Sequence, residues 1–219
     1  MTERTALITG GEGDLALALR ACLEASGWQV LAPGRGTLDV TSTASVSGYF
    51  KALPRLDLLI NNAGLVLDKP VALMSAEAWD QVIDVNLSGA FRCARAAIKL
   101  MARQRSGHIL NVGSFAALAG TEGQANYAAA KAGLIALTQS IAREYGARSI
   151  RCNCVLPGFL ETKMTRSVLE AHRERVLAAH ALGTLNTTAD AARFIVQLDT
   201  FPHISGQIFQ LDSRSSSHL

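Results

Sequence analysis

The chain has 219 residues, of which 49% are hydrophobic, 18% charged and 5% aromatic, and its formal net charge is +3. This length fits one α/β domain, and so much apolar mass with so little net charge excludes a disordered chain. The basic residues form no cluster, so nothing favours nucleic acid as a partner, and the apolar excess indicates a sheet covered on both faces or a large subunit interface.

Short apolar runs alternate with longer helical runs, which is typical of a parallel sheet with crossover helices. In chain order, the predicted strands are 5–9, 29–32, 38–40, 56–60, 107–112, 151–156 and 207–211. The predicted helices between them are 15–25, 44–52, 75–105 with a Ser-Gly pair at 88–89 able to break it, 124–145, 164–181 and 188–198. Thr41, Ser42 and Ser75 are expected to be helix caps.

This order predicts an α/β fold with a doubly wound parallel sheet, Rossmann-like, in three αβα layers. No repeat or linker divides the chain, so we expect one domain over residues 1–212. The Ser-rich tail at 213–219 is expected to be frayed.

Features of location and bonding point to a cytoplasmic protein. No apolar run reaches the roughly 18 to 20 residues that span a bilayer, and the first residues do not form a secretory signal, so no membrane is expected. The four cysteines form no CxxC pair, and Cys152 and Cys154, two apart on one strand, rarely bridge. Reduced thiols are the expected state, and no metal-ligand spacing is present.

A glycine-rich turn runs from Thr9 to Ala16, between the first predicted strand and the first predicted helix. Glycines at such a place let the backbone approach a pyrophosphate, which a helix N-terminus attracts. The same turn also serves simply to reverse a chain, so this motif alone leaves both interpretations open.

A second motif places Tyr127 four residues before Lys131 on a predicted helix. This spacing puts both side chains on one helix face, where the ammonium favours the phenolate form of a nearby tyrosine. Ser114, directly after a predicted strand, supplies a hydroxyl that could hold a carbonyl oxygen. Each feature alone is more often ordinary packing, a cap or a turn.

Taken together, these motifs resemble the short-chain dehydrogenase/reductase family over essentially the whole chain. They occur in the order and spacing of that family: Thr9-Gly10, Asn61-Asn62-Ala63-Gly64, Asn86, Ser114, Tyr127-x-x-x-Lys131 and Pro157-Gly158. The stretch from Asn111 to Thr162 is similar to the 3-oxoacyl-(acyl-carrier-protein) reductase branch.

The resemblance implies a catalytic set of four residues. Tyr127 would donate a proton to a ketone, while Lys131 would lower the pKa of Tyr127 and hold the nicotinamide ribose. Ser114 would bind the substrate carbonyl. Asn86 would sit where the long helix deviates, with its backbone holding a water that links Lys131 to solvent.

The resemblance also implies a nicotinamide cofactor, with NADP(H) preferred and NAD(H) as the alternative. The residues that would bind it are Gly10, Gly11, Glu12, Gly13, Asp14, Leu15, Arg35, Asp39, Val40, Asn61, Ala63, Gly64, Tyr127, Lys131, Pro157, Gly158, Leu160 and Thr162. The alternatives are that Asn61 and its neighbour form only a turn and that Asp39 is only a helix cap.

Three departures from the family pattern bear on function. Asp14 and Ala16 stand at the second and third glycines of the loop. The Asp14 side chain could cap the helix, but a carboxylate there would repel the pyrophosphate that the same amides should attract. Only 25 residues separate Val30 from Leu56, so this edge of the sheet should be reduced and the adenosine end more open. The chain ends its last strand with 211–214, Leu-Asp-Ser-Arg, where the family often has a Gly-rich turn.

The residues expected to select the coenzyme lie at and after the end of the second predicted strand. No acidic residue ends that strand, whereas Arg35 could pair with a 2′-phosphate, which favours NADPH. Glu12 argues against it, because the family often has a hydroxyl or basic residue there, and Arg35 could equally be a solvated loop arginine.

Three functions remain open at this point. The first is reduction of a 3-oxoacyl thioester on coenzyme A or an acyl carrier protein. An acidic carrier protein could dock on basic side chains near the mouth, such as Lys163, Arg166 and Arg103, although these could equally be solvated surface residues. The second is a dehydrogenase of a small alcohol, sugar or cyclic ketone, decided by the lid at 160–183. The third is a non-catalytic partner of an active homologue. The expected assembly is a homotetramer.

Overall fold

The computed structural model describes residues 4–214. Six strands form one parallel sheet in the order β2-β1-β3-β4-β5-β6. The strands are β1 (Thr5–Ile8), β2 (Gln29–Leu31), β3 (Leu58–Asn61), β4 (Gly107–Val112), β5 (Ile150–Leu156) and β6 (Ile208–Gln210). The α-helices are α1 (Asp14–Ala25), α2 (Thr43–Lys51), α3 (Ala76–Ile83), α4 (Gly89–Gln104), α5 (Ala116–Ala119), α6 (Ala125–Tyr145), α7 (Arg166–Ala178) and α8 (Thr188–Leu198).

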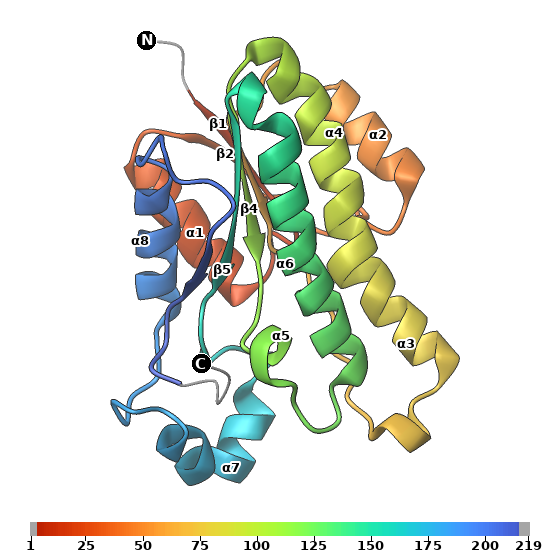
Figure 1. The fold of residues 1–219 in the computed structure, drawn as a ribbon, viewed down its shortest axis with the longest axis vertical. Helices are drawn as coiled ribbons and strands as arrows, with labels where there is room; N and C mark the ends of the chain where they lie inside the picture. The colour runs from red at the N-terminus through yellow and green to blue at the C-terminus, as the bar shows by residue number, and fades with distance from the viewer. Residues whose placement is uncertain (1–3, 215–219) are drawn as a thin grey trace.

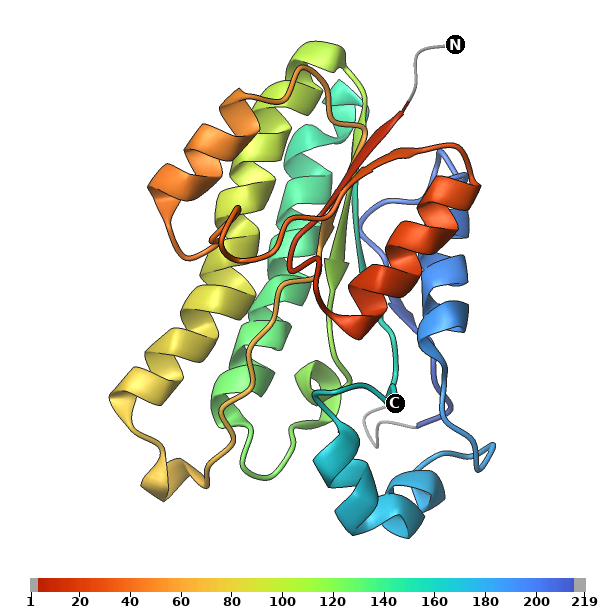
Figure 2. The ribbon, with the colours of Figure 1, turned by 180° about the vertical axis from the view of Figure 1, so that it is seen from behind.

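Helices cover both faces of the sheet, as the predicted Rossmann-like α/β fold requires. Helices α1 and α8 pack together on one face, and α2, α4 and α6 lie on the other, as Figure 1 shows and Figure 2 confirms from behind. Helix α7 and the short α5 lie beyond one end of the sheet (Figure 1). The three-layer architecture predicted from the alternating runs is therefore confirmed.

The core is divided by the sheet into two apolar layers. Along β1, Ala6 and Ile8 belong to the layer under α1 and α8, whereas Leu7 belongs to the layer under α2, α4 and α6. This alternation follows from the two-residue period of a strand, and both layers are apolar because both faces are buried. It explains why the strands read as continuous apolar runs rather than alternating ones.

The topology places a crevice at the carboxyl ends of β1 and β3. The chain leaves β1 toward the edge strand β2 and then crosses back to β3, on the other side of β1. Loops that leave two neighbouring strands in opposite directions open a crevice between them, where α/β proteins bind ligands. Residues 9–13 and 62–66 form these two loops.

The strand predicted at 38–40 is absent, so that prediction was wrong. Leu38 and Val40 are buried against the α2–α4 layer but pair with no strand, because a turn at Gly34 carries the chain over the face of the sheet. The described sheet ends at β2, which confirms the reduced edge expected from the short segment.

The long helical stretch is bent rather than broken. Between α3 and α4 the residues Asp84–Ser88 form a π-helical segment, so the break predicted at 88–89 is instead a bulge just before it. Ser75 caps α3 and Ser42 caps α2 through bonds from Ala78 and Ser45, as predicted, whereas the Thr41 hydroxyl bonds Asp39 instead. Helix α5 was not predicted; most other boundaries agree within two residues.

Part of the tail expected to be frayed is in fact anchored. The Ser213 carbonyl accepts from the Ala181 N–H at 3.1 Å, and Arg214 pairs with Asp212. The rest of the tail, 215–219, lies outside the described residues. No helix within residues 4–214 is long and apolar enough to cross a membrane.

Candidate active site

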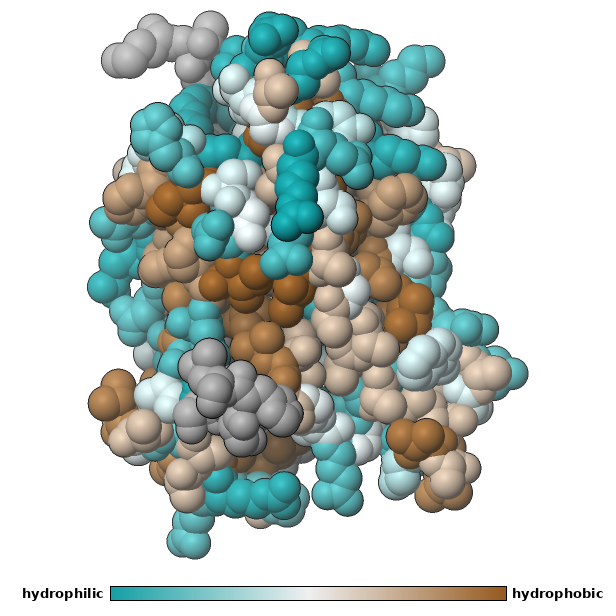
Figure 3. Space-filling view, viewed as in Figure 1, coloured by the Kyte–Doolittle hydropathy of each residue, from teal (hydrophilic) through white to brown (hydrophobic). Residues whose placement is uncertain are grey.

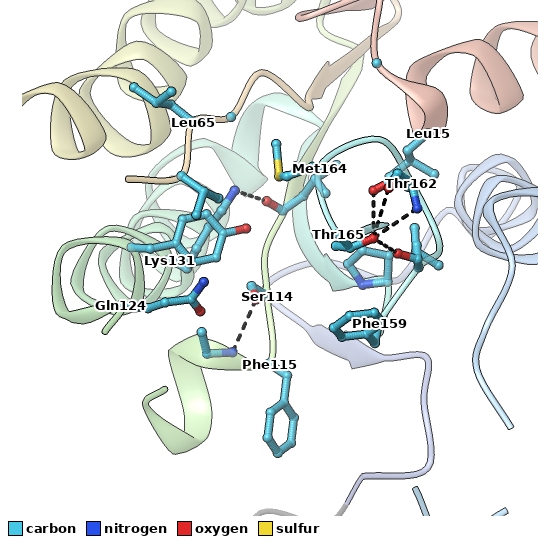
Figure 4. A pocket seen from close by; sticks show the side chains of 18 of the residues that line it. Leu15, Leu65, Ser114, Phe115, Gln124, Lys131, Phe159, Thr162, Met164 and Thr165 are labelled. Atoms are coloured by element: carbon cyan, nitrogen blue, oxygen red, sulfur yellow. Dashed lines mark hydrogen bonds between the residues drawn. The ribbon is translucent and has the colours of Figure 1, made fainter. Parts of the chain in front are cut away.

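A cleft of about 1170 Å³ opens at the carboxyl ends of the strands and extends under α7. Its walls come from the loops after β1, β3, β4 and β5 and from the segment after β2. Figure 4 shows side chains from these segments converging on it, with Lys131 and Ser114 on one side and Thr162 and Leu15 on the other. The cleft therefore lies at the switch point of the sheet, where the topology predicts a ligand.

The glycine loop is held against the loop after β3. The Thr9 hydroxyl accepts bonds from the backbone N–H groups of Asn62 and Ala63, both at 3.0 Å. Gly10 has φ +66°, and a Cβ there would lie 2.9 Å from the Ala63 Cα, so only glycine allows this contact. Gly11 packs against the Ala32 backbone, where a Cβ would be 2.1 Å from the carbonyl oxygen.

Most residues predicted to bind a cofactor line this cleft. They are Gly10, Glu12, Gly13, Asp14, Leu15, Arg35, Asp39, Val40, Ala63, Gly64, Tyr127, Lys131, Pro157, Gly158, Leu160 and Thr162, and Ser114 of the predicted catalytic set joins them. Three predicted residues do not line it: Gly11, Asn61 and Asn86.

Asn61 lies in the core rather than in the cleft, which corrects its predicted role as a lining residue. Its Nδ2 donates to the Asn111 Oδ1 at 2.8 Å, and Asn111 in turn donates to the Thr138 hydroxyl at 2.8 Å. These buried side chains join β3, β4 and α6. The cleft residue is the neighbouring Asn62, whose Nδ2 donates to the carbonyls of Thr9 and Gly10.

Asn86 sits in the π-helical segment, where the prediction placed a deviation of the helix. Its buried Nδ2 donates to the carbonyls of Leu65, at 2.8 Å, and Val82, at 2.9 Å. The side chain thus ties the loop after β3 to the helix and shapes the cleft from behind. Such π-helical segments, in which the backbone hydrogen bonds join residues i and i+5, occur frequently at functional sites.

Ser114 follows the end of β4 and faces the cleft (Figure 4). Its Oγ accepts a hydrogen bond from the Ala116 N–H at 3.2 Å, which orients the hydroxyl. Because this bond uses an acceptor position, the hydroxyl hydrogen stays available to donate to a carbonyl oxygen in the cleft.

Tyr127 and Lys131 stand one helical turn apart on α6, with the Lys131 Nζ 5.4 Å from the centre of the Tyr127 ring. The Nζ is buried and donates to the Val112 carbonyl at 2.7 Å. Burial lowers the pKa of Lys131 to about 8. Burial also raises the pKa of Tyr127, against the opposing effect of the Ser114 hydroxyl, so the phenol stays protonated at neutral pH. Burial thus outweighs the lowering of the Tyr127 pKa by its neighbour Ser114.

Asp14 does not cap its own helix. It is the first residue of α1, and its carboxylate accepts a hydrogen bond from the Lys163 N–H at 2.6 Å. Gly13 is the N-cap and makes no side-chain hydrogen bond. The first backbone N–H groups of α1 therefore have no capping side chain and stay open to the cleft. Asp14 thus connects the glycine loop to the start of the lid.

One cation and two carboxylates meet at the end of the cleft beside β2: Arg35 and Asp39 come from the segment after β2, and Glu12 comes from the glycine loop. Arg35 is 81% exposed at its side chain, and its Nε lies 3.6 Å from the Asp39 Oδ2. Hydrogen bonds from Thr41 hold the pKa of Asp39 below its usual value. The Glu12 carboxylate packs against Gly34.

The lid and the strand-end loops contribute cleft residues that the sequence did not indicate. Met164, Val168 and Val176 line the cleft from α7 and its N-terminal loop, and Phe115 and Phe159 line it from the strand-end loops. Met164 and Val168 are exposed although apolar, which is expected where a helix covers a ligand site. In the sequence, only the apolar positions of this otherwise polar helix could have indicated that it lines the cleft.

The cleft fits an extended dinucleotide. It runs from Arg35 and Asp39 beside β2 to Pro157 and Thr162 beside β5, and passes the uncapped start of α1. A positive φ at Gly10 and the absence of a side chain at Gly13 leave room for a pyrophosphate beside those amides. The carboxylate of Asp14, at the first residue of α1, opposes such an anion, whereas the second carboxylate of this loop, that of Glu12, lies against Gly34. No cluster of three or more potential metal ligands occurs among residues 4–214.

Known proteins share this architecture and sequence. The family profile described as enoyl-(acyl carrier protein) reductase, a short-chain dehydrogenase/reductase profile, matches residues 18–213. The chain is 35% identical to 3-oxoacyl-[acyl-carrier-protein] reductase FabG of Escherichia coli (strain K12), over 95% of this chain and 96% of that protein. It is 41% identical to FabG of Thermotoga maritima over 72% of this chain and 65% of that protein.

A solved structure agrees with this relationship. The crystal structure of gox2181 superposes with a TM-score of 0.91 at 27% identity, covering 97% of this chain and 95% of that one. The profile covers residues 18–213, which include every cleft segment after the glycine loop, and the Escherichia coli relative spans 95% of the chain. The chain therefore belongs to the short-chain dehydrogenase/reductase family and is an NAD(P)-dependent oxidoreductase.

Proposed function

We propose that the protein reduces the ketone of a 3-oxoacyl thioester to a secondary alcohol with NADPH. The observation that carries this proposal is the meeting of Ser114, Tyr127 and Lys131 on one side of a cleft whose other side is the glycine loop and the start of the lid. A hydroxyl donor, a protonated phenol and an ammonium group are what carbonyl reduction by hydride transfer requires.

In this mechanism Ser114 and Tyr127 act together on the substrate carbonyl. The bound cofactor supplies the hydride. The Ser114 hydroxyl, oriented by the Ala116 N–H, donates to the carbonyl oxygen and stabilises the charge that develops on it. Tyr127 donates its proton to that oxygen, and the raised pKa of the phenol keeps this proton in place at neutral pH until the alkoxide forms.

Lys131 prepares the site for this transfer. Its Nζ is fixed by the Val112 carbonyl and uses one of its three N–H groups there, so two remain for the ribose hydroxyls of a cofactor and for a proton path. Asn86, in the π-helical segment behind the cleft, would hold the water that returns a proton to Lys131.

The lid supports an acyl thioester as the substrate class. Met164, Val168 and Val176 give the cleft an apolar wall on the side of α7, which suits an acyl chain. Curated relatives over nearly the whole chain are named 3-oxoacyl-[acyl-carrier-protein] reductases. Lys163 and Arg166, at the start of the lid, would receive an acidic carrier protein. Arg103, in the last turn of α4, lies beside the start of β4, at the end of the sheet away from the cleft, so its predicted place near the mouth was wrong.

NADPH is the proposed coenzyme because Arg35 is the cation available beside β2. It lines the cleft, and its weak 3.6 Å contact with Asp39 leaves the guanidinium free to turn toward a 2′-phosphate. Asp39 and Glu12 stay close enough to favour a ribose hydroxyl instead, which makes NADH the alternative.

The proposed assembly is a cytoplasmic homotetramer with β6 at one interface. Strand β6 is the edge strand of the sheet, and its residues are only half-buried. Figure 3 shows apolar side chains gathered on this face between α8 and α6. Phe194 of α8 and Phe209 of β6, whose rings lie 5.5 Å apart, are both only partly buried. Analytical ultracentrifugation measures the assembly directly, and a monomer would contradict the proposal.

Steady-state assays with two substrate classes test the function. Oxidation of NADPH is followed with acetoacetyl-coenzyme A and, separately, with a set of small alcohols and cyclic ketones in both directions. The proposal predicts the higher kcat/KM with the thioester. A higher value with a small ketone would favour the second function, and absence of NADPH binding at millimolar concentration would favour a non-catalytic partner subunit.

A further inference from the structure

The last described residues, 211–214, run from the end of β6 to the cleft, and we call them the C-terminal strap. This is the place where the chain has Leu-Asp-Ser-Arg instead of the glycine-rich turn frequent in its family. The strap contacts two parts of the site that are far apart in sequence, the end of the lid and the loop that carries Ser114.

At the lid end, the strap is bound by backbone and side-chain groups. Ala181 donates its N–H to the Ser213 carbonyl, and Leu182 donates its N–H to the Ser213 hydroxyl, both at 3.1 Å. The buried His180 ring donates from Nδ1 to the Val176 carbonyl at 2.7 Å and turns its Nε2 toward the Asp212 carboxylate, 3.7 Å away. The strap thus fixes the point where the lid ends.

At the serine end, one side chain makes the connection. The Arg214 guanidinium lies over the Phe115 ring, with 4.2 Å between its Cζ and the ring centre. Its Nε donates to Asp212 Oδ2 at 2.6 Å, and its Nη2 lies 2.5 Å from the same oxygen, which holds the guanidinium plane against the ring. The Asp212 side chain is only 1% exposed and that of Arg214 17%, so solvent screens this pair little.

Phe115 is the residue directly after Ser114. In Figure 4 its ring points away from Lys131, and the Arg214 guanidinium of the strap lies over this ring. Holding the ring fixes the backbone between Ser114 and Ala116, and this same backbone supplies the N–H that orients the Ser114 hydroxyl.

We infer that Arg214 is a positioning residue for Ser114, acting through Phe115, and that the strap couples the lid to the serine loop. The importance given to Ser114 rests on the proposed function, while the mechanical coupling does not. Arg214 contributes no proton and no hydride. It restricts where the serine hydroxyl lies when a carbonyl oxygen enters the cleft.

Two substitutions break the contact from its two sides. R214A removes the cation, and F115L keeps an apolar side chain but removes the ring. R193A is the matched control, because Arg193 also pairs with an aspartate, Asp190, at 2.7 Å, but on the exposed face of α8. Thermal melting of each variant checks that the fold is retained.

The first readout is hydrogen exchange of the segment 114–119, which does not depend on any substrate. The inference predicts that R214A and F115L each speed its exchange about tenfold, that the double variant exchanges no faster, and that R193A has no effect. Unchanged exchange in R214A, or an equal rise in R193A, would overturn the coupling.

The second readout is turnover, which tests the link to Ser114. R214A is expected to lower kcat about tenfold with little change in KM for NADPH, and to change kcat less than twofold when Ser114 is already alanine. Equal losses in both backgrounds would overturn the positioning role. If the unaltered chain reduces no ketone, the proposed function fails, while the exchange measurement still decides whether the strap holds the serine loop.

Discussion

The Asp14 carboxylate accepts a hydrogen bond from the Lys163 N–H at 2.6 Å, so the glycine loop and the lid are joined across the cofactor cleft. The carboxylate stands at the first residue of α1, where an incoming pyrophosphate would meet the open amides of the helix. It therefore binds a lid donor and places negative charge where a second anion must approach.

Removing this charge should tighten cofactor binding. D14N keeps a side-chain oxygen that can accept from Lys163 but removes the repulsion, so we expect the Kd for NADPH to fall about threefold to tenfold. Titration of NADPH fluorescence measures the Kd, with D190N on exposed α8 as the control. An unchanged or larger Kd in D14N would show that the carboxylate does not oppose the cofactor.

Coenzyme preference should depend on Arg35. R35A is expected to raise the KM for NADPH by about tenfold or more and to leave the KM for NADH nearly unchanged, since only NADPH carries the 2′-phosphate. R20A is a suitable control, because Arg20 is also exposed and paired with a carboxylate, that of Glu24. Equal effects on the two coenzymes would remove the case for Arg35.

The buried ammonium of Lys131 should make the reaction slower at basic pH, which appears as a falling limb in the pH–rate profile. Burial lowers the pKa of this group to about 8, so the ammonium loses its proton as the pH rises through that value. We expect kcat/KM for NADPH, which reports groups of the cofactor-free protein, to fall above about pH 8.

The variant K131R separates this effect from other titrations. Its guanidinium stays charged over the whole range, so its lower residual activity should show no limb near pH 8. A wild-type profile that stays level to pH 10 would contradict the assignment of this limb to Lys131.

Away from the cleft, one buried carboxylate should dominate stability. Asp199 receives bonds from His108, Arg4 and Arg151, and these contacts outweigh burial and hold its pKa below the usual value. D199N would leave buried donors facing a neutral group, so we expect the free energy of unfolding to fall by about 3 kcal/mol, measured by urea denaturation.

The control is D190N, which breaks the exposed pair of Asp190 with Arg193 and should cost less than about 0.5 kcal/mol. Similar losses in both variants would argue against the buried network. The contribution of Asp199 is present above the unfolded pKa of the carboxyl group. It is lost as the pH falls through the lowered pKa of the folded state.

Much of the architecture was predictable because the apolar residues follow clear patterns in this chain, continuous runs in the buried strands and a helical period in the helices. Strand β4 and helix α8 have the predicted bounds, since a continuous apolar run and an amphipathic run with a Thr cap each allow one interpretation. The strand at 38–40 was predicted wrongly because Leu38 and Val40 are apolar for a different reason, burial in a turn.

The site was predictable where a motif fixes the backbone and less so where a tertiary contact decides. Tyr127, Lys131 and Ser114 line the cleft as expected. Asn61 and Asn62 are adjacent amides, and only the direction of the strand decides that Asn62 meets the glycine loop. The partner of Asp14 lies 149 positions away, which no local pattern indicates.

The central claim is that Tyr127 gives its proton to a carbonyl in this cleft. Y127F removes only the hydroxyl, so NADPH should still bind while single-turnover reduction of acetoacetyl-coenzyme A slows by about a thousandfold. The measurement is the decay of NADPH absorbance in a stopped-flow instrument, with Kd for NADPH determined on the same preparation. Reduction by Y127F at more than about a tenth of the wild-type rate, with equal NADPH binding, would contradict the account.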